Sequence, residues 1–254
     1  MVNVEINNTN IYEEGRCMGE AKQTLLLAKF GKEEHIRQLQ EGKIFFNAIK
    51  TYRDDGTSYR GDSMEGKIPL DPKKIAIYDK EGNNILDKIP RPTEVIQEFG
   101  GDEELKMFCA AIINVETIND LGKNEWVLKE KFKNAVKDFG EYVLVFYSAE
   151  LIENIDKVAD TFESGIVYDA RPILYRNFKD YEHTEEYRAT GSFMDPYFVK
   201  SLKYKMQNEW RIIIDGEKES LKTNCGTGFL LQTQPLKSST LMKTSDFFNS
   251  KLYF

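Results

Sequence analysis

The sequence predicts an α+β fold, with one large domain at residues 23–254 and an N-terminal arm or leading strand at residues 1–22. Three observations predict it. Short apolar runs bounded by polar or turn residues recur along the chain, as they do in buried strands. Only a few segments have apolar residues at helical spacing, and strands and helices do not alternate regularly as in a parallel βαβ fold. No internal repeat or linker divides the chain.

Composition narrows the class of protein. The 254 residues are 41% hydrophobic and 30% charged, enough to bury a large core. A net charge of −7 argues against nucleic acid as an obligate partner, although a local basic surface is compatible with it. The N-terminus lacks the pattern of a signal peptide, and no apolar run is long enough to span a bilayer. We therefore expect a cytoplasmic protein without a membrane partner.

Three cysteines, Cys17, Cys109 and Cys225, are widely spaced and odd in number. Without a CxxC pattern or a Cys/His cluster they predict neither a disulfide framework nor a zinc site. The two histidines, His35 and His183, have no partner at triad-like spacing, so neither is assigned a catalytic role.

The first half of the chain is expected to contain strands at 24–30, 43–49, 74–79, 85–89 and 107–115, a helix at 32–42 and a polar loop at 51–72. The helix is predicted because Ile36 and Leu39 share a face and Gly42 suits the position after a helix end. The two strands around EGNN are expected to form a hairpin.

The second half is expected to contain strands at 142–147, 165–170, 209–215 and 228–236, and helices at 124–139, 149–160 and from 195 toward 203. The last helix is predicted from Asp195 and Pro196, which suit its cap and first position. The first two helices are predicted from apolar residues at helical spacing.

The stretch YKMQNEWRIII at residues 204–214 carries the main functional signal. On a strand, Gln207, Glu209 and Arg211 point to one face and the residues between them to the other. The carboxylate can hydrogen-bond a ribose hydroxyl and stabilise a developing oxocarbenium cation, and the amide can orient a nucleophile. The plainer interpretation is that Glu209 and Arg211 form a solvated ion pair on a sheet face.

The N-terminal third supports the catalytic interpretation. Its order is a strand, a short helix ending at Gly42, a second strand and a polar loop. With the late Q-x-E strand, this order resembles the ADP-ribosyltransferase fold, over about a third of the chain. More closely, the chain resembles uncharacterised bacterial proteins of the DUF2971 and AbiGi-like type. The residues that carry this resemblance are Lys29, Phe30, Tyr204, Gln207, Glu209, Trp210 and Arg211.

The resemblance implies split mixed or antiparallel sheets with a few peripheral helices, and NAD as substrate. It makes Glu209 the catalytic glutamate and Gln207 the residue two positions before it. Lys29 falls where transferases place the histidine or arginine that binds the nicotinamide ribose. The middle transferase motif has no clear match, and its candidates are Tyr142, Tyr147 and Tyr168. The AbiGi-like resemblance also implies a role in phage defence or a toxin–antitoxin system.

Further residues are assigned to NAD binding. Arg60 in the polar loop can grip a pyrophosphate, because guanidinium matches phosphate oxygens. Phe30 and Tyr52 can stack on a ring of the cofactor, although core packing is the commoner role of strand phenylalanines. Arg211 completes this set.

The polar loop also permits other interpretations. Asp54 or Asp55 with Glu65 and Lys67 loosely matches the carboxylate and lysine pattern of metal-dependent nucleases. The plainer interpretation is a solvated charged loop, and we assign no metal ligand.

The leading hypothesis is therefore an NAD-dependent ADP-ribosyltransferase-like enzyme whose acceptor, a protein or a nucleic acid, is unknown. The alternative is a non-catalytic phage-defence component that binds a protein or a nucleotide signal. A metal-dependent nuclease is the third.

Overall fold

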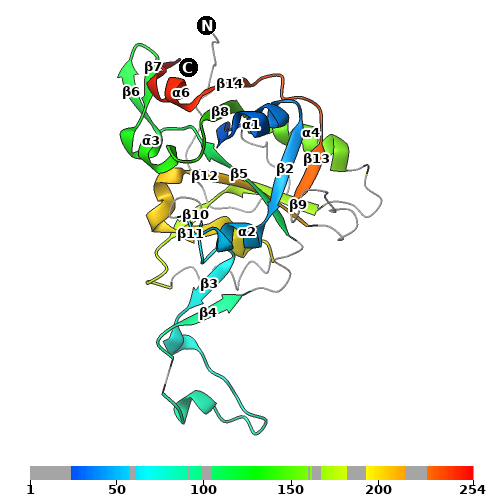
Figure 1. Cartoon of the computed structure of the whole chain (residues 1–254). Helices are drawn as coiled ribbons and strands as arrows, with labels where there is room; N and C mark the ends of the chain where they lie inside the picture. Colours follow the sequence, from blue (N-terminus) through cyan, green and yellow to red (C-terminus); the bar gives the residue numbers. More distant parts are fainter. Residues whose placement is uncertain are drawn as a thin grey trace.

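The computed structural model (Figure 1) describes residues 24–57, 61–90, 92–98, 105–159, 161, 167–181, 193–215 and 228–253. The arm or leading strand expected at residues 1–22 and the candidate Arg60 lie outside the described residues. The described part of the chain is α+β, with mostly antiparallel sheets and few helices, as predicted. None of its helices has the length and apolar character needed to cross a bilayer.

A large antiparallel sheet forms the centre of the fold. Its strands are β1 (Leu26–Gly31), β2 (Lys43–Ala48), β5 (Lys106–Ile112), β8 (Tyr142–Tyr147), β9 (Val167–Pro172), β12 (Glu209–Asp215), β13 (Phe229–Gln232) and β14 (Thr240–Lys243). They pair in the order β13-β2-β5-β1-β8-β14, and β12 pairs with both β5 and β9. All of these strands except β14 overlap segments that the sequence predicted as strands.

One face of this sheet is covered by α1 (Glu33–Gln40) and α4 (Ser148–Ala159). Both helices bury apolar side chains in one core cluster with the sheet. Ile36 and Leu39 supply the buried face of α1, as predicted. Gly42 follows this helix with φ 87°, and a β-carbon there would lie 2.5 Å from the carbonyl oxygen of Thr233.

The other face is covered by α2 (Ile49–Asp54), α3 (Glu130–Val136), α6 (Thr244–Asn249) and the 3₁₀ helix η3 (Asp195–Phe198). Phe132 and Val136 of α3 pack with Phe247 of α6 in one cluster. Ile49 of α2 packs with η3 in another. The candidate site lies on this face.

The remaining elements are β3 (Lys67–Leu70), β4 (Val95–Glu98), β6 (Ile118–Gly122), β7 (Glu125–Leu128), β10 (Leu174–Arg176), β11 (Val199–Ser201), β15 (Leu252–Tyr253), η1 (Pro72–Lys74), η2 (Ile85–Asp87) and η4 (Leu202–Gln207). β10 and β11 pair in parallel, and β3 and β4 are antiparallel. β3, β4 and the chain between them project from the body as an arm (Figure 1).

Five predicted segments differ in the structure. The strands expected at 74–79 and 85–89 are reduced to one isolated bridge between Tyr78 and Asn84. The arm they occupy is largely exposed, and among the described residues no neighbouring sheet extends these strands. The loop expected at 51–72 contains most of α2 and all of β3.

The helix expected at 124–139 begins only at Glu130, because residues 125–128 form β7. Lys123 and Asn124 both have positive φ, 57° and 60°, the conformation of a two-residue hairpin turn. This turn pairs β7 with β6. The helix expected from Asp195 is instead η3, β11 and η4, because residues 199–201 pair in parallel with β10.

Two strands, β1 and β2, pair with opposite ends of one edge of β5. Its end, Ala111–Ile112, pairs with β1, and its start, Lys106–Met107, pairs with β2. β12 pairs along the whole of the opposite edge. The centre of β5 therefore lies where β1 and β2 part, beside Arg211 of β12.

Candidate functional site

Glu209 and Arg211 lie on one face of β12, as predicted. Trp210, Ile212 and Ile214 alternate with them and enter the core cluster on the other face. Arg211 Nε donates to Glu209 Oε1 at 2.5 Å. Arg211 is only 1% exposed and Glu209 only 8%, so the interpretation of a solvated ion pair is wrong.

The Arg211 guanidinium group binds a second carboxylate, from the turn before β3. Its Nη2 donates to Glu65 Oε2 at 2.8 Å, and its Nη1 contacts the other oxygen of Glu65. Nη1 also donates to the carbonyl oxygen of Tyr197 at 2.6 Å. Burial opposes the charged form, but Glu209 and Glu65 outweigh it and raise the pKa of Arg211. The guanidinium therefore stays charged.

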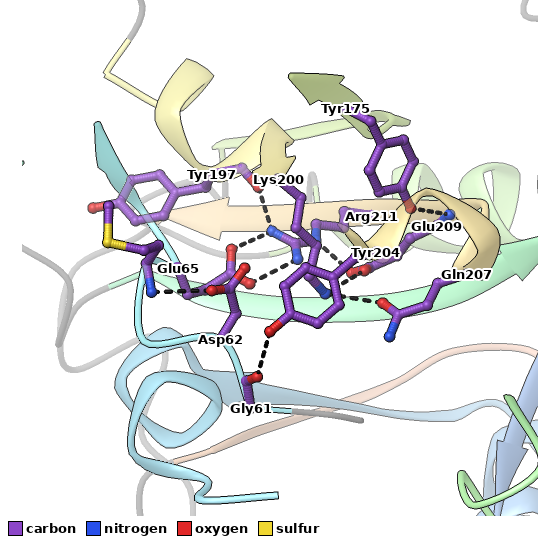
Figure 2. Close-up of polar contacts among 11 residues, drawn as sticks. Gly61, Asp62, Glu65, Tyr175, Tyr197, Lys200, Tyr204, Gln207, Glu209 and Arg211 are labelled. Atoms are coloured by element: carbon purple, nitrogen blue, oxygen red, sulfur yellow. Dashed lines mark hydrogen bonds and ion pairs between the residues drawn. The ribbon is translucent and has the colours of Figure 1, made fainter. Parts of the chain in front are cut away.

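Lys200 of β11 completes the cluster (Figure 2). Its Nζ donates to Glu209 Oε2 at 3.0 Å and to Gln207 Oε1 at 3.1 Å. Gln207 belongs to η4 and not to the strand, because Asn208 turns the chain with φ 46°. Gln207 is therefore linked to Glu209 through Lys200, and not by the alternation of strand side chains that the sequence suggested.

Glu209 is ionised in this environment. Burial raises the pKa of its carboxyl group, but Arg211 and Lys200 lower it further, to well below the usual range. Burial also disfavours the charged form of Lys200, and Glu209 reverses that effect. Glu65, Arg211, Glu209 and Lys200 thus form a buried network of two anions and two cations.

The turn that carries Glu65 is fixed by backbone contacts. Arg53 of α2 donates from Nε and Nη2 to the carbonyl oxygen of Glu65, at 3.1 and 2.7 Å. The hydroxyl of Tyr204 donates to the carbonyl oxygen of Gly61 at 3.0 Å. Gly66 has φ 68°, and a β-carbon there would meet the ring of Tyr197 at 2.3 Å.

Two further groups line Glu209. The hydroxyl of Tyr175 on β10 accepts a hydrogen bond from the backbone N–H of Glu209 at 2.9 Å. Cys109 of β5 lies opposite Arg211 in the strand register. Burial, assisted by the charge of Glu209, raises the pKa of both the Tyr175 hydroxyl and the Cys109 thiol. Both groups are therefore neutral near pH 7.

Tyr52, which the sequence analysis assigned to cofactor binding, also lies near Glu209. It comes from α2 and packs beside the cluster that contains Tyr197. Burial raises the pKa of its hydroxyl, and the negative charge of Glu209 adds to this effect.

Lys29 approaches the site from the face of the sheet opposite Glu209. It lies between Ala28 and Phe30, which face the Glu209 side, so its own side chain starts on the opposite face. Its Nζ lies 4.7 Å from the ring centroid of Phe108 and donates to the carbonyl oxygen of Cys109 at 2.6 Å. The structure thus brings Lys29 to the centre of β5 but does not place it across a cleft from Glu209.

Phe30 is a core residue. It is 7% exposed and packs against the rings of Phe139, Phe247 and Phe248. This burial favours core packing over cofactor stacking, because a stacking ring must present a face to the ligand.

The candidates for the middle motif are not gathered at Glu209. Tyr142 and Tyr147 lie at the two ends of β8. Tyr168 packs against the cluster on the opposite face and contacts Asp156. Tyr175, which the sequence did not single out, is the tyrosine that binds the Glu209 backbone.

The nuclease pattern does not converge. Glu65 binds Arg211, whereas Lys67 Nζ pairs with Glu98 at 2.6 Å. Asp54 is exposed at the end of α2. Within the described ranges, no group of histidine, cysteine and acidic side chains could hold a metal ion.

Sequence reasoning missed Lys200 and Tyr175 and set Cys109 aside. Lys200 fell inside a predicted helix, and β10 and β11 have only three residues each, too few to show a period. The available signal was the stretch VKSLKYKMQ at 199–207, which contains three lysines and no acidic residue and ends two residues before Glu209.

Comparisons with known protein families, curated proteins and solved structures found no match for this chain.

Proposed function

We propose that the chain is an NAD-dependent enzyme of the ADP-ribosyltransferase type, with Glu209 as its catalytic carboxylate. The observation that supports this is the ionised state of Glu209 at the start of β12. Two cations hold the carboxylate charged in a site that excludes most water. A fixed negative charge in such surroundings stabilises a developing cation more than it would in water.

The reaction breaks the bond between ribose C1′ and the nicotinamide nitrogen. The bonding electrons leave with nicotinamide, whose ring becomes neutral, and C1′ acquires oxocarbenium character. Glu209 stabilises that cation, an acceptor then bonds to C1′, and the acceptor loses a proton. Gln207 orients the acceptor, and Tyr52 and Arg211 flank the carboxylate. Lys29 and Phe30 have no part in this scheme.

The alternative is a non-catalytic component that binds a protein or a nucleotide signal. One observation favours it: each oxygen of Glu209 already accepts a hydrogen bond from an internal cation. A carboxylate neutralised in this way can have a purely structural role. Through Arg211 and Lys200, Glu209 links β12 to β11 and to the turn that carries Glu65. A role in phage defence or a toxin–antitoxin system is supported by the sequence resemblance alone.

The deciding experiment is NAD consumption by purified protein, comparing the wild type with Glu209→Gln and Glu65→Gln. Both substitutions remove one carboxylate from Arg211, so Glu65→Gln controls for damage to the network. If Glu209 is catalytic, only Glu209→Gln abolishes nicotinamide release, while NAD binding is largely kept because the charge acts mainly in the transition state.

Thermal melts of all three proteins show whether each variant is folded. Glu209→Asp, which keeps the charge but withdraws it by one carbon, serves if Glu209→Gln does not fold. Equal loss in the Glu65 and Glu209 variants, or no NAD consumption by the wild type, would favour the binding component.

A further inference from the structure

Two elements far apart in the sequence form a basic surface on this acidic protein. Residues 129–137, which contain α3, include four lysines and one glutamate. Residues 199–207, which contain β11 and η4, include three lysines and no acidic residue. α3 packs against η4 (Figure 1), so both sets lie together in a chain whose net charge is −7.

Four of these lysines face solvent: Lys131, Lys137, Lys203 and Lys205. In the described part of the chain none of the four forms an ion pair with a carboxylate. The other three lysines have internal partners. Lys129 donates to the carbonyl oxygen of Val115, Lys133 pairs with Glu130, and Lys200 pairs with Glu209. Within the described residues, the surface therefore presents about four positive charges that no carboxylate pairs with.

We propose that α3 and η4 form a binding surface for the phosphodiester backbone of a nucleic acid. Four cations on two short elements match a ligand with closely spaced anions. α3 has seven residues and is about 10 Å long, a span in which one nucleic-acid strand presents about three phosphates. Protein surfaces usually intersperse both signs of charge and fit this pattern less well.

The chemistry of the surface indicates binding without sequence preference. Lysine acts as a point charge on phosphate and lacks the planar fork with which arginine recognises bases. Leu202 and Met206 on η4 are 46% and 40% exposed, and their aliphatic side chains offer no aromatic stacking platform for bases. The affinity should therefore come from charge and fall steeply with salt.

The surface ends at the candidate site. Gln207 is the last residue of η4, so a nucleic-acid strand bound along η4 would pass close to the buried charge network around Glu209. The inference does not depend on the chemistry of Glu209, and a protein without NAD activity can still bind through this surface.

The test is fluorescence anisotropy with labelled RNA, single-stranded DNA and duplex DNA, each of about 20 nucleotides or base pairs, at about 50 to 300 mM salt. For a single strand we expect the plot of log affinity against log salt to have a slope of about −3, since each of four neutralised phosphates contributes about −0.7. The double variant Lys203→Glu/Lys205→Glu should halve this slope and weaken binding about tenfold or more near 100 mM salt.

The control is Lys80→Glu/Lys88→Glu, which makes the same charge change at exposed positions of the arm. It should leave the slope unchanged. Equal losses in the two variants would reduce the effect to net charge and overturn the proposal, as would no binding at the lowest salt. Tighter binding of a poly-glutamate peptide of equal charge would assign the surface to an acidic protein instead. NAD consumption by the wild type is measured separately. Its result does not affect the interpretation of these binding experiments.

Discussion

Arg211 on the buried strand β12 binds Glu65 with both ends of its guanidinium group, across 146 positions of the sequence. The same guanidinium holds Glu209, the proposed catalytic carboxylate. One side chain thus fixes the turn before the arm and orients Glu209. The stability of the fold and the geometry of the site therefore depend on the same contacts.

Replacing Arg211 with methionine should strongly destabilise the protein. The change leaves Glu65 and Glu209 buried with only Lys200 to compensate them, and breaking such a network costs about 3–5 kcal/mol. Urea denaturation at pH 7 measures the free energy of unfolding. The double variant Arg211→Met/Glu65→Leu should recover part of it, and a loss below about 1 kcal/mol in the single variant would contradict a buried, paired network.

The stability of the wild type should fall in acid. The pKa of Glu209 is lower in the folded protein than its unfolded value of about 4.3, so the unfolded chain binds the proton more tightly. Its contribution is complete above about pH 5 and is lost as the pH falls toward the folded pKa. Urea denaturation at pH 7 and pH 4 should show a smaller difference for Glu209→Gln, and equal differences would show that other carboxyl groups dominate.

Tyr175→Phe removes the hydroxyl that accepts the hydrogen bond of the Glu209 amide. An unsatisfied buried N–H costs about 1–3 kcal/mol, and the Glu209 amide should exchange its hydrogen faster. Tyr253→Phe is the matched control, because Tyr253 is 45% exposed. If both variants have the stability of the wild type, water satisfies the amide in place of the phenol.

Gly66→Ala should cost more than Gly82→Ala. Both glycines have positive φ, 68° and 84°, so both variants bear a backbone strain of about 1 kcal/mol. Only at position 66 does the added methyl meet a ring, that of Tyr197 at 2.3 Å, whereas position 82 is open. Thermal melts should separate the variants, and equal melting temperatures would mean that the turn holding Glu65 can move.

The fold could be predicted where a local pattern decides the structure. β1, β2, β5 and β8 are bounded apolar runs, and Gly42 ends α1 with the positive φ that its position suggested. The hairpin predicted at 74–89 was wrong, because an apolar pattern does not show whether a neighbouring sheet is present to extend the strands. The alternation of Glu209 and Arg211 was visible in the sequence, but their burial was not, since it depends on Glu65 from a distant turn.

The pairing of β12 with β5 has a consequence for the order in which the protein can fold during synthesis. β5 is the apolar centre of the sheet, yet the contacts on its second edge come from residues 96 positions later, as in the bond from Asn208 to Ile112. At usual rates of translation that distance takes about 5–20 s. During this interval the nascent chain carries a hydrophobic strand with one uncovered edge, which is a binding site for chaperones and a risk of aggregation.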